Sequence, residues 1–291
     1  MLPRDLIKHV KRLEIIAKRA VHDQLAGQYQ SVFKGRGMDF VDVRPYQPGD
    51  DIRVIDWNVS ARTDELHIKQ FVEERELTVF LLVDASGSQL FGTQNQRKQE
   101  AAAELGALLA FSAISNNDRV GLMTFTDRVE TFIPPKKGRK HVLRVITEIL
   151  DQSPDGRGTD IHTALEYLAR IQRKKAVVFL LSDFLDDSFE RALHIATKRH
   201  ELVPVVITDP MEEQLPNLGL VRIEDPESGE VFTVDTTSRK IRRAFEEAAR
   251  GKREAREKLF RRLKIDFVNV RTDADHIAPL IKYFRLRSRR A

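Results

Sequence analysis

Short, continuous apolar runs alternate with longer stretches of helical character along the chain from residue 77 onward. The runs are rich in β-branched and aromatic residues, which is typical of strands buried on both faces. They cover residues 79–83, 120–125, 177–181, 203–207 and 267–270. The helical stretches between them cover residues 97–115, 140–150, 161–172 and 189–199. Such alternation predicts a mostly parallel α/β sheet with helices on both of its faces.

Three segments depart from this alternation. Residues 129–133 are expected to form an antiparallel edge strand. Two runs, residues 220–224 and 230–234, are separated by a turn and predict a hairpin. A charged helix is expected over residues 238–263, and its apolar side consists of Ile241, Phe245, Ala248, Leu259 and Leu263. The hairpin and this helix together form an insertion at about residues 215–264.

The first 76 residues have a different character. Apolar positions recur at helical spacing over residues 4–22 and predict an amphipathic helix, whose basic face we interpret as solvated rather than lipid-binding. Residues 24–76 contain short alternating runs and turns, which indicate a small β-rich lead-in. We therefore divide the chain into this N-terminal region (1–76), an α/β domain (77–286) and a basic tail (287–291).

Composition narrows the class of protein. The chain has 291 residues, 41% of them hydrophobic, so it can bury a core as one large or two small domains. A net charge of +5 is too small to indicate nucleic-acid binding, although basic residues gather near the C-terminus: Lys282, Arg285, Arg287, Arg289 and Arg290. The lack of cysteine excludes disulfides, thiolate zinc sites and thiol catalysis.

No apolar run approaches the ~18 residues of a membrane span, and the charged N-terminus does not resemble a signal peptide. We expect a soluble, cytoplasmic protein.

The segment Asp84-Ala85-Ser86-Gly87-Ser88 directly follows the first predicted strand. Its carboxylate and two hydroxyls are hard oxygen ligands, and Gly87 permits a tight turn that lets both serines point to one place. Oxygen ligands without Cys or His suit Mg²⁺, Mn²⁺ or Ca²⁺ rather than zinc. Taken alone, the segment fits a serine-rich turn that caps a helix equally well.

Two further residues could reach the same point. Thr159 lies in a glycine-flanked loop that opens a predicted helix, and Asp183 follows closely on the third buried run. Ligands of open parallel sheets gather beyond the carboxyl ends of the strands, where the strand order reverses. A carboxylate buried at a strand end also needs a partner. As alternatives, Thr159 could be an N-cap, and Asp183 could cap the helix that begins near Ser188.

Five residues resemble, in order, spacing and strand context, the metal-ion-dependent adhesion site of von Willebrand factor A domains: Asp84, Ser86, Ser88, Thr159 and Asp183. The resemblance extends over residues 77–210. It implies one divalent cation, with Mg²⁺ as the first choice and Mn²⁺ or Ca²⁺ as alternatives. By this resemblance the three hydroxyls would bind the ion, and the two aspartates would bind it directly or through water.

The lead-in narrows the resemblance further. Residues 33–40 (FKGRGMDF), 44–51 (RPYQPGDD), 55–57 (IDW) and 60–62 (SAR) look like the signature of a bacterial family, domain of unknown function 58. In that family such a lead-in precedes a von Willebrand A-like domain. Its members resemble accessory partners of MoxR-type AAA+ ATPases, so the resemblance implies a protein partner of that kind.

Enzymatic chemistry finds little support in the sequence. The chain has no Gly-Lys-Ser/Thr phosphate loop, no G-x-S-x-G serine and no histidines at zinc-ligand spacing. An isolated ion without a general base is a poor catalyst, but it can hold an acidic side chain of a partner. We therefore expect a non-enzymatic, metal-dependent protein-interaction module. The alternatives are a metal-dependent phosphohydrolase and a basic surface that docks on membrane or nucleic acid.

The charged residues of the lead-in have two interpretations. Its arginines could form a fixed docking surface beside the metal site, or they could pair with aspartates that hold the lead-in on the sheet. The arginines are Arg36, Arg44, Arg53 and Arg62, and the aspartates are Asp39, Asp42, Asp50 and Asp56. A second acidic site made by Asp50, Asp51 and Asp56 is conceivable, but turns rich in Asp are common.

Overall fold

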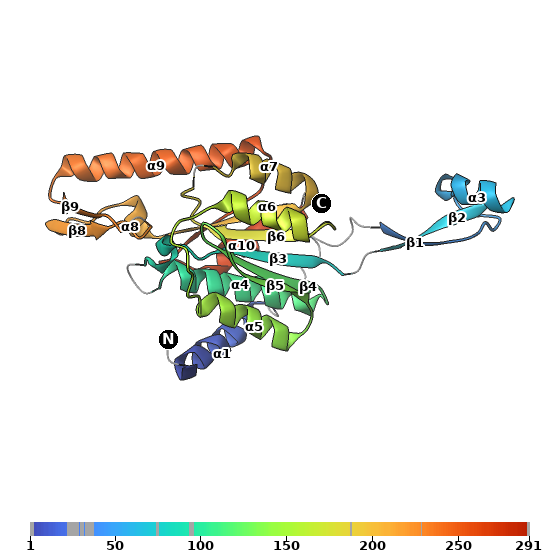
Figure 1. Cartoon of the computed structure of the whole chain (residues 1–291), viewed down its shortest axis with the longest axis horizontal. Helices are drawn as coiled ribbons and strands as arrows, with labels where there is room; N and C mark the ends of the chain where they lie inside the picture. Colours follow the sequence, from blue (N-terminus) through green and yellow to red (C-terminus); the bar gives the residue numbers. More distant parts are fainter. Residues whose placement is uncertain are drawn as a thin grey trace.

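A six-stranded sheet forms the centre of the molecule (Figure 1). The structure is a computed structural model and describes residues 3–21, 29, 32, 38–73, 76–92, 96–186, 188–227 and 229–289. In spatial order the strands are β10 (Val268–Arg271), β7 (Glu201–Thr208), β6 (Val177–Ser182), β3 (Thr78–Asp84), β4 (Arg119–Phe125) and β5 (Val129–Lys136). All neighbouring pairs in it are parallel except β4 and β5. The predicted fold class and the antiparallel edge strand are confirmed.

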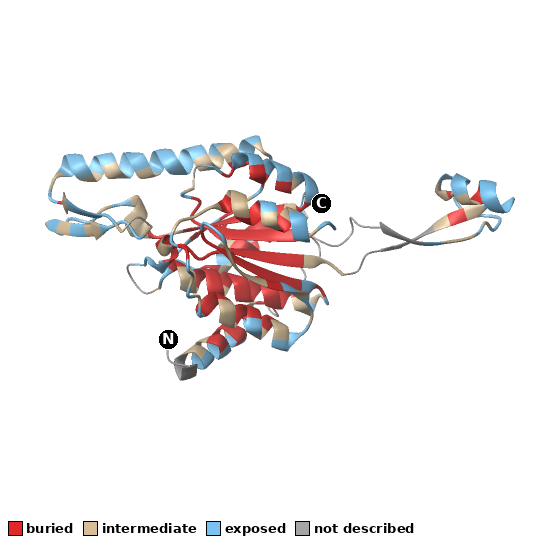
Figure 2. Cartoon of the chain, in the orientation of Figure 1, coloured by how far each residue is buried: buried red, intermediate tan, exposed pale blue. Residues whose placement is uncertain are grey.

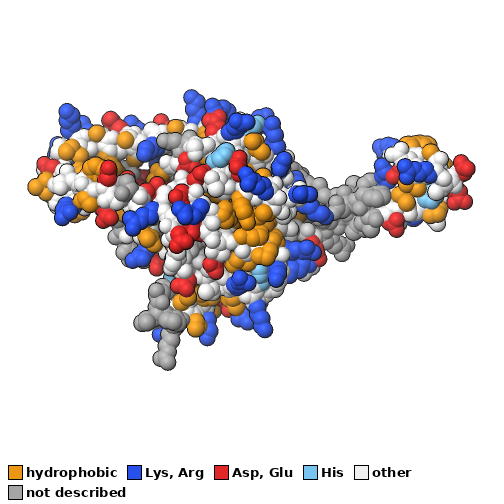
Figure 3. All heavy atoms as spheres, viewed as in Figure 1, with side chains coloured by type: hydrophobic (Ala, Val, Ile, Leu, Met, Phe, Trp, Pro, Cys, Tyr) orange, Lys and Arg blue, Asp and Glu red, His pale blue; other side chains and the backbone are white. Residues whose placement is uncertain are grey.

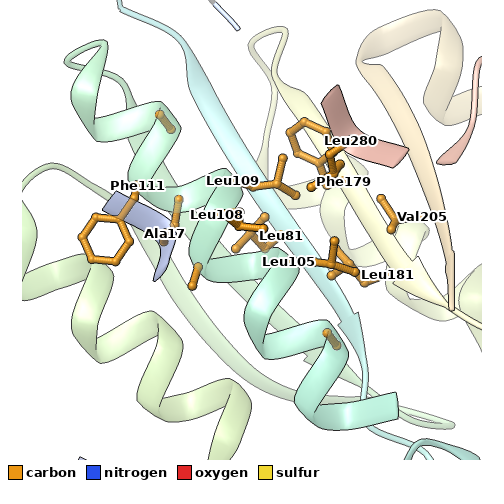
Figure 4. Close-up of a cluster of buried hydrophobic side chains, with 14 of the residues drawn as sticks. Ala17, Leu81, Leu105, Leu108, Leu109, Phe111, Phe179, Leu181, Val205 and Leu280 are labelled. Atoms are coloured by element: carbon orange, nitrogen blue, oxygen red, sulfur yellow. The ribbon is translucent and has the colours of Figure 1, made fainter. Parts of the chain in front are cut away.

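Alternate residues of β3 enter two separate hydrophobic cores. Val79, Leu81 and Val83 face the core that Figure 4 shows in part, whereas Phe80 and Leu82 face the other. Because helices cover both faces of the sheet, each of these five side chains is at most 1% exposed. The first core receives α1 (Pro3–Ala20), α4 (Lys98–Ser115), α5 (Arg139–Leu150) and α10 (Ile277–Ser288), and the second receives α6 (Ile161–Ile171) and α7 (Glu190–Arg199).

Helix α4 is buried nearly all round, as its composition predicted. One side packs on the sheet, and α1 and α5 cover the other. Figure 2 shows that the buried layer continues from the sheet into this helix. Its first residue, Lys98, is fully buried as well. An ammonium group without access to water needs an anionic partner, and this partner lies at the candidate site described below.

The lead-in forms a small arm. Strands β1 (Met38–Pro45) and β2 (His67–Glu73) pair antiparallel and coincide with the predicted alternating runs. A short 3₁₀ helix, η2 (Ile52–Val54), and helix α3 (Trp57–Thr63) connect them. Helix α3 was not predicted; Asp56 caps it by accepting hydrogen bonds from two backbone N–H groups. Trp57 lies on this helix with 67% of its surface exposed.

Charged residues of the arm pair with one another. Arg44 makes a bidentate ion pair with Asp50, at 2.7 and 2.8 Å, and Arg53 pairs with Asp51 at 3.0 Å. Arg44 is therefore paired with one of the expected aspartates, but this pair lies within the arm and does not join the arm to the six-stranded sheet; Arg36 lies outside the described residues. Because the aspartates of this region have separate partners, they do not form a second acidic site.

The arm adjoins the amino end of β3. Strand β2 ends at Glu73, and β3 begins at Thr78 and runs away from the arm to Asp84 (Figure 1). A strand of this length measures about 20 Å. The carboxyl end of β3 is therefore at the far side of the sheet from the arm, and the expectation of an arginine docking surface directly beside the metal site is wrong.

An insertion lies between β7 and β10. It contains α8 (Pro210–Glu213), the hairpin strands β8 (Leu220–Glu224) and β9 (Val231–Asp235), and α9 (Arg239–Arg262). Both the predicted hairpin and the predicted charged helix are present, and Figure 2 shows them largely exposed. The expected apolar side of α9 is only partly covered. Ile241 is 38% exposed and Ala248 is also exposed, whereas Phe260 near the end of the helix is buried.

The C-terminal helix α10 was not predicted. Leu280, Ile281 and Phe284 bury one of its sides in the first core. Arg287 lies over the ring of Tyr283, 5.9 Å from its centroid, and forms an ion pair with Glu201 of β7. These contacts hold the last turn, so the helix runs on to Ser288 and the expected basic tail at 287–291 begins inside it.

Candidate metal centre

The strand order of the sheet reverses at β3. The chain passes from β3 to β4 on one side and later reaches β6 on the other, so the carboxyl ends of β3 and β6 border a topological switch point. Asp84 is the last residue of β3, and Asp183 follows the last residue of β6. Because the two strands are parallel neighbours, both aspartates lie at the same edge.

Asp84 is buried, and both of its carboxylate oxygens are engaged. Oδ1 accepts a hydrogen bond from the Ser86 backbone N–H at 2.9 Å, and Oδ2 accepts one from Ser182 Oγ at 2.6 Å. Burial raises the pKa of Asp84 to about 7, and the negative charge of Asp183 adds to this rise. A cation bound between these two carboxylates would relieve both effects.

Ser86 and Ser88 lie on the tight turn that leads into the 3₁₀ helix η3 (Gly87–Leu90). Their hydroxyl oxygens are 3.1 Å apart, and Ser88 Oγ donates a hydrogen bond to Asp183 Oδ2 at 2.7 Å. Both serine side chains are buried. The structure thus connects four of the five predicted ligands through hydrogen bonds at this edge of the sheet.

Asp183 accepts hydrogen bonds on both oxygens. Besides Ser88, Lys98 Nζ donates to Oδ2 at 2.7 Å and Gln89 Nε2 donates at 3.3 Å. The Leu185 backbone N–H donates to Oδ1 at 3.2 Å. The alternative that Asp183 caps a helix is therefore wrong, because its side chain bonds to residues of η3 and α4 and to its own turn.

Phe184 positions the Asp183 turn. Its φ angle of 56° is in the left-handed region, which bulky residues rarely adopt. The ring of Phe184 is buried and packs edge-on against Phe189 and Phe260, with centroid distances of 5.6 and 5.3 Å. Aromatic packing therefore holds a strained backbone conformation directly after the carboxylate.

Lys98 is a central residue that the sequence interpretation missed. Its ammonium group donates to both Asp183 and Glu212 of α8, and the side chain is fully buried. Burial alone would lower the pKa of Lys98, but the two carboxylates outweigh burial and leave the pKa raised. A signal existed, because Lys98 is a charged residue at the start of a helix that is otherwise apolar nearly all round.

The loop that carries Thr159 is anchored to neighbouring elements. The Gly156 N–H donates to Glu130 Oε1 at 2.9 Å, and a Cβ at this glycine would lie 2.2 Å from Thr126 Oγ1. The carbonyl of Arg157 accepts a hydrogen bond from the Gly87 N–H at 2.9 Å. The last contact joins the Thr159 loop to the serine turn.

Thr159 is not the N-cap of α6. That role belongs to Asp160, which accepts a hydrogen bond from the Thr163 backbone at 2.9 Å. The hydroxyl of Thr159 donates to Glu227 Oε1 at 2.8 Å. Thr159 therefore reaches the edge of the candidate site, but its described hydrogen bond goes to a residue that was not among the predicted ligands.

Glu227 comes from the turn of the β8–β9 hairpin. Its backbone N–H donates to Asp225 Oδ1 at 2.9 Å, which shapes the turn. Burial raises the pKa of Glu227, and the hydrogen bond from Thr159 acts against this rise. Acidic residues are common in turns, so the sequence held no signal that this one would meet a loop 68 residues away.

The spacing of the oxygen atoms fits a small divalent ion. Neighbouring ligands of an octahedral Mg²⁺, bound at about 2.0–2.1 Å, lie about 2.9 Å from each other. The two serine hydroxyls are 3.1 Å apart and Ser88 Oγ is 2.7 Å from Asp183 Oδ2, which are hydrogen-bond distances that are also short enough for shared coordination of one ion. The side-chain oxygen of Gln89, Oε1, is buried nearby without a hydrogen-bond partner. A buried acceptor of this kind usually accepts a hydrogen bond from water.

The charges around the site also fit a divalent ion. Four carboxylates lie in or beside it: Asp84, Asp183, Glu212 and Glu227. Two cations contact Asp183, since Lys98 binds its carboxylate and Arg256 of α9 donates to its backbone carbonyl at 2.8 Å. In its fully ionised form the site therefore carries two excess negative charges, which one divalent cation would neutralise.

Carboxylates and histidines alone do not form a metal site in the described part of the chain. In the described part of the chain, His, Asp and Glu side chains nowhere gather in groups of three that could hold a metal ion. A metal centre at the switch point therefore depends on the hydroxyls of Ser86, Ser88 and Thr159. No helix among the described residues is long and apolar enough to cross a membrane.

Comparison with known families supplies the context of this site. Residues 42–255 match the family described as "Protein of unknown function DUF58". The chain belongs to this family. The predicted family is thereby confirmed, and the match includes the arm as well as the switch point.

Two uncharacterized bacterial proteins are similar to much of the chain. The uncharacterized protein Rv1480 of Mycobacterium tuberculosis is 32% identical over 288 residues, which cover 97% of this chain and 90% of the relative. The uncharacterized protein YeaD of Bacillus subtilis is 26% identical over 182 residues, which cover 62% of this chain and 43% of YeaD. The first alignment extends over the arm, the sheet and the insertion together.

Similar solved structures include one that is described as a VWA domain. An aerotolerance-related membrane protein from Bacteroides fragilis has 16% identity and a TM-score of 0.48, covering 74% of this chain and all of the other. BatB from Bacteroides thetaiotaomicron has 16% identity and a TM-score of 0.45, covering 73% of this chain and 99% of the other. The SpRpn10 VWA domain has 14% identity and a TM-score of 0.39, covering 70% of this chain and 93% of the other.

Proposed function

We propose that this DUF58 protein is a non-enzymatic, metal-dependent protein-interaction module of the cytoplasm. One Mg²⁺ ion would be held by Asp84, Ser86, Ser88, Thr159 and Asp183. The bound ion supplies an exchangeable position that accepts an acidic side chain of a partner protein. The observation that carries the proposal is the cluster of hydroxyl and carboxylate oxygens at the switch point, whose spacing and excess charge suit such an ion.

The surroundings of the site favour binding over hydrolysis. A hydrolase needs a general base that can take a proton from water. Lys98 is charged and donates to two carboxylates, so it cannot accept a proton. Asp84 accepts hydrogen bonds on both oxygens, and Asp183 does so too. The hydrogen bonds hold these two carboxylates in place, which suits the holding of an ion better than the transfer of a proton from water.

The proposed partner is a hexameric AAA+ ATPase of the MoxR type. Family membership supports this proposal, since DUF58 proteins resemble accessory partners of such ATPases. The face seen in Figure 3 favours a protein partner over nucleic acid. Figure 3 shows acidic and basic side chains interspersed over one face of the molecule, without a continuous basic area of the kind that phosphate backbones require.

The first prediction tests metal binding. Asp84→Ala removes a carboxylate of the site, so we expect Mg²⁺ and Mn²⁺ binding by calorimetry to fall by at least roughly 100-fold, with an unchanged circular dichroism spectrum. Asp151→Ala, which changes an exposed aspartate at the end of α5, is the matched control and should bind like the wild type. Undiminished binding in Asp84→Ala contradicts the proposal. Ser86→Ala provides a second variant that leaves both buried carboxylates in place.

Asp84→Ala and its control Asp151→Ala also test whether the protein lacks catalytic activity. ATP, generic phosphoesters and peptides should be turned over no faster by the wild type than by Asp84→Ala. A metal-dependent rate that is lost in Asp84→Ala and kept in Asp151→Ala would instead establish the phosphohydrolase.

A further inference from the structure

The tip of the β8–β9 hairpin covers the candidate metal centre. Glu227 Oε1 accepts the hydrogen bond of Thr159 at 2.8 Å. The preceding residue, Pro226, lies directly over the serine turn, because a Cβ on Gly87 would be only 2.4 Å from the Pro226 carbonyl oxygen. Two consecutive residues of the hairpin thus contact both loops that supply hydroxyl ligands.

Glu227 has the chemistry of a ligand in this position. Its Oε1 accepts a hydrogen bond from the Thr159 hydroxyl at 2.8 Å, so this carboxylate lies beside one of the five predicted ligands. Its carboxylate is half-buried, and the described hydrogen bond that it accepts comes from Thr159. It is also one of the four carboxylates that give the site its excess of two negative charges. A carboxylate from a partner protein would need to approach the same oxygen atoms.

The hairpin behind the tip is loosely packed on the body. A cavity of about 590 Å³ lies beneath it, lined largely by apolar residues that include Phe91, Leu215, Val221 and Phe245. The outer residues of the hairpin are exposed, and Leu220 at the start of β8 is 75% exposed. Few buried contacts would be lost if the tip lifted, so its position depends strongly on the contacts of Pro226 and Glu227.

We propose that Glu227 is the chain's own acidic ligand for the bound ion, and that it occupies the coordination position that a partner's carboxylate would take. The inference rests on the proposed function, since it needs an ion at the site. Binding of an acidic partner then requires displacement of the hairpin tip. The hairpin is thus an internal competitor, which lowers the affinity of the site for weak carboxylate ligands and exposes its apolar underside when a strong ligand replaces it.

Calorimetric titration with MnCl₂ tests the assignment of Glu227 as a ligand. We expect Glu227→Gln to weaken Mn²⁺ binding by at least roughly tenfold, since a charged oxygen is replaced by a neutral amide. Glu224→Gln makes the same change on an exposed residue of β8 and should leave the affinity unchanged. Asp84→Ala should abolish binding. If Asp84→Ala and Glu227→Gln both bind like the wild type, the proposed function fails; if only Glu227→Gln does, the ion site stands and this inference is wrong.

Hydrogen exchange of the hairpin supplies a readout that does not depend on affinity. Saturating Mg²⁺ should slow amide exchange over residues 220–235 in the wild type and in Glu224→Gln, because the ion ties the tip to the site. In Glu227→Gln the same concentration of bound ion should leave this exchange unchanged. Equal protection of the hairpin in all three proteins would overturn the inference, even if the affinities differ.

Discussion

At the scale of single residues, the fold brings three charged side chains from separate elements into contact. Lys98 is a helix residue, Asp183 a strand-end residue and Glu212 a residue of a short helix, yet one ammonium group binds both carboxylates without access to water. This arrangement sets the charge that an ion at the switch point has to neutralise. It also means that the Lys98 ammonium group remains at the site whether or not a metal is bound.

A second prediction follows from this buried lysine. Lys98→Met keeps the length of the side chain but leaves the buried Asp183 and the partly exposed Glu212 without their cation, so we expect the free energy of unfolding to fall by about 3–5 kcal/mol. Chemical denaturation measures this loss. Lys140→Met, on the exposed start of α5, should change stability by less than about 0.5 kcal/mol. An unchanged denaturation midpoint in Lys98→Met would show that the two carboxylates are protonated or solvated instead.

At the scale of helices and strands, burial on both faces made most elements readable from the sequence. All five strands coincide with the predicted apolar runs within one or two residues; β3, β4, β6 and β7 do so because they are covered on both sides, whereas the edge strand β10 alternates between buried and exposed residues. The helix α10 was missed although Ile277, Leu280, Ile281 and Phe284 have helical spacing. Because this segment is rich in arginine, its end was predicted to be a basic tail. In the structure the arginines extend from a helix with one buried side.

Only part of the candidate site could be predicted from the sequence, because some of its contacts join residues that are far apart in the chain. The ligands that end strands or sit in adjacent loops follow from the order of the sheet. Contacts such as Lys98 with Asp183, 85 residues apart, and Thr159 with Glu227, 68 residues apart, depend on tertiary packing. No local spacing or periodicity records such pairs, so a buried charge on an apolar helix was the one available hint.

A third prediction concerns the attachment of α1 to α5. Glu14 of α1 accepts a hydrogen bond from Arg139 at 2.9 Å and lies 2.8 Å from Lys18 Nζ. The Arg139 hydrogen bonds dominate and, against the opposing effect of burial, lower the pKa of Glu14 to about 2. This carboxylate therefore contributes stability above its unfolded pKa of about 4.5, and the contribution is lost as the pH falls from there towards 2.

The comparison of Glu14→Gln with the wild type measures that contribution. At pH 7 we expect Glu14→Gln to be less stable by on the order of 1–2 kcal/mol, a value reduced because Arg139 is exposed to solvent. The difference should shrink as the pH is lowered from 5 to 3. Glu254→Gln, on the exposed face of α9, should show no such dependence. A difference that stays constant over this range would assign the effect to packing rather than to charge.

At the scale of the whole molecule, different structural features lie at the two ends of the sheet. The carboxyl ends of the strands bear the candidate metal centre and the hairpin, whereas the amino end of β3 bears the arm. A partner that uses the metal alone would contact only the first end. A large, ring-shaped ATPase could contact both, and the arm would then give a specificity that a bare ion cannot.

A fourth prediction separates these possibilities through the partner. If an acidic residue of a MoxR-type ATPase binds the ion, a pull-down of the ATPase should be lost with EDTA and with Ser86→Ala. It should depend less on salt than an association of exposed charges would. Recovery of the ATPase in EDTA at wild-type levels would make the metal structural and place the docking surface elsewhere.

The arm also carries a built-in optical label. Trp57 is the only tryptophan of the chain, and it lies 67% exposed on α3. Fluorescence excited at the red edge of tryptophan absorption therefore reports on the arm alone, without contributions from the tyrosines of the core. A blue shift on addition of a tryptophan-free partner would mean that the indole has left water, and an unchanged emission maximum would mean that the partner stays at the other end of the sheet. The emission of Trp57 thus shows which end of the sheet a partner contacts.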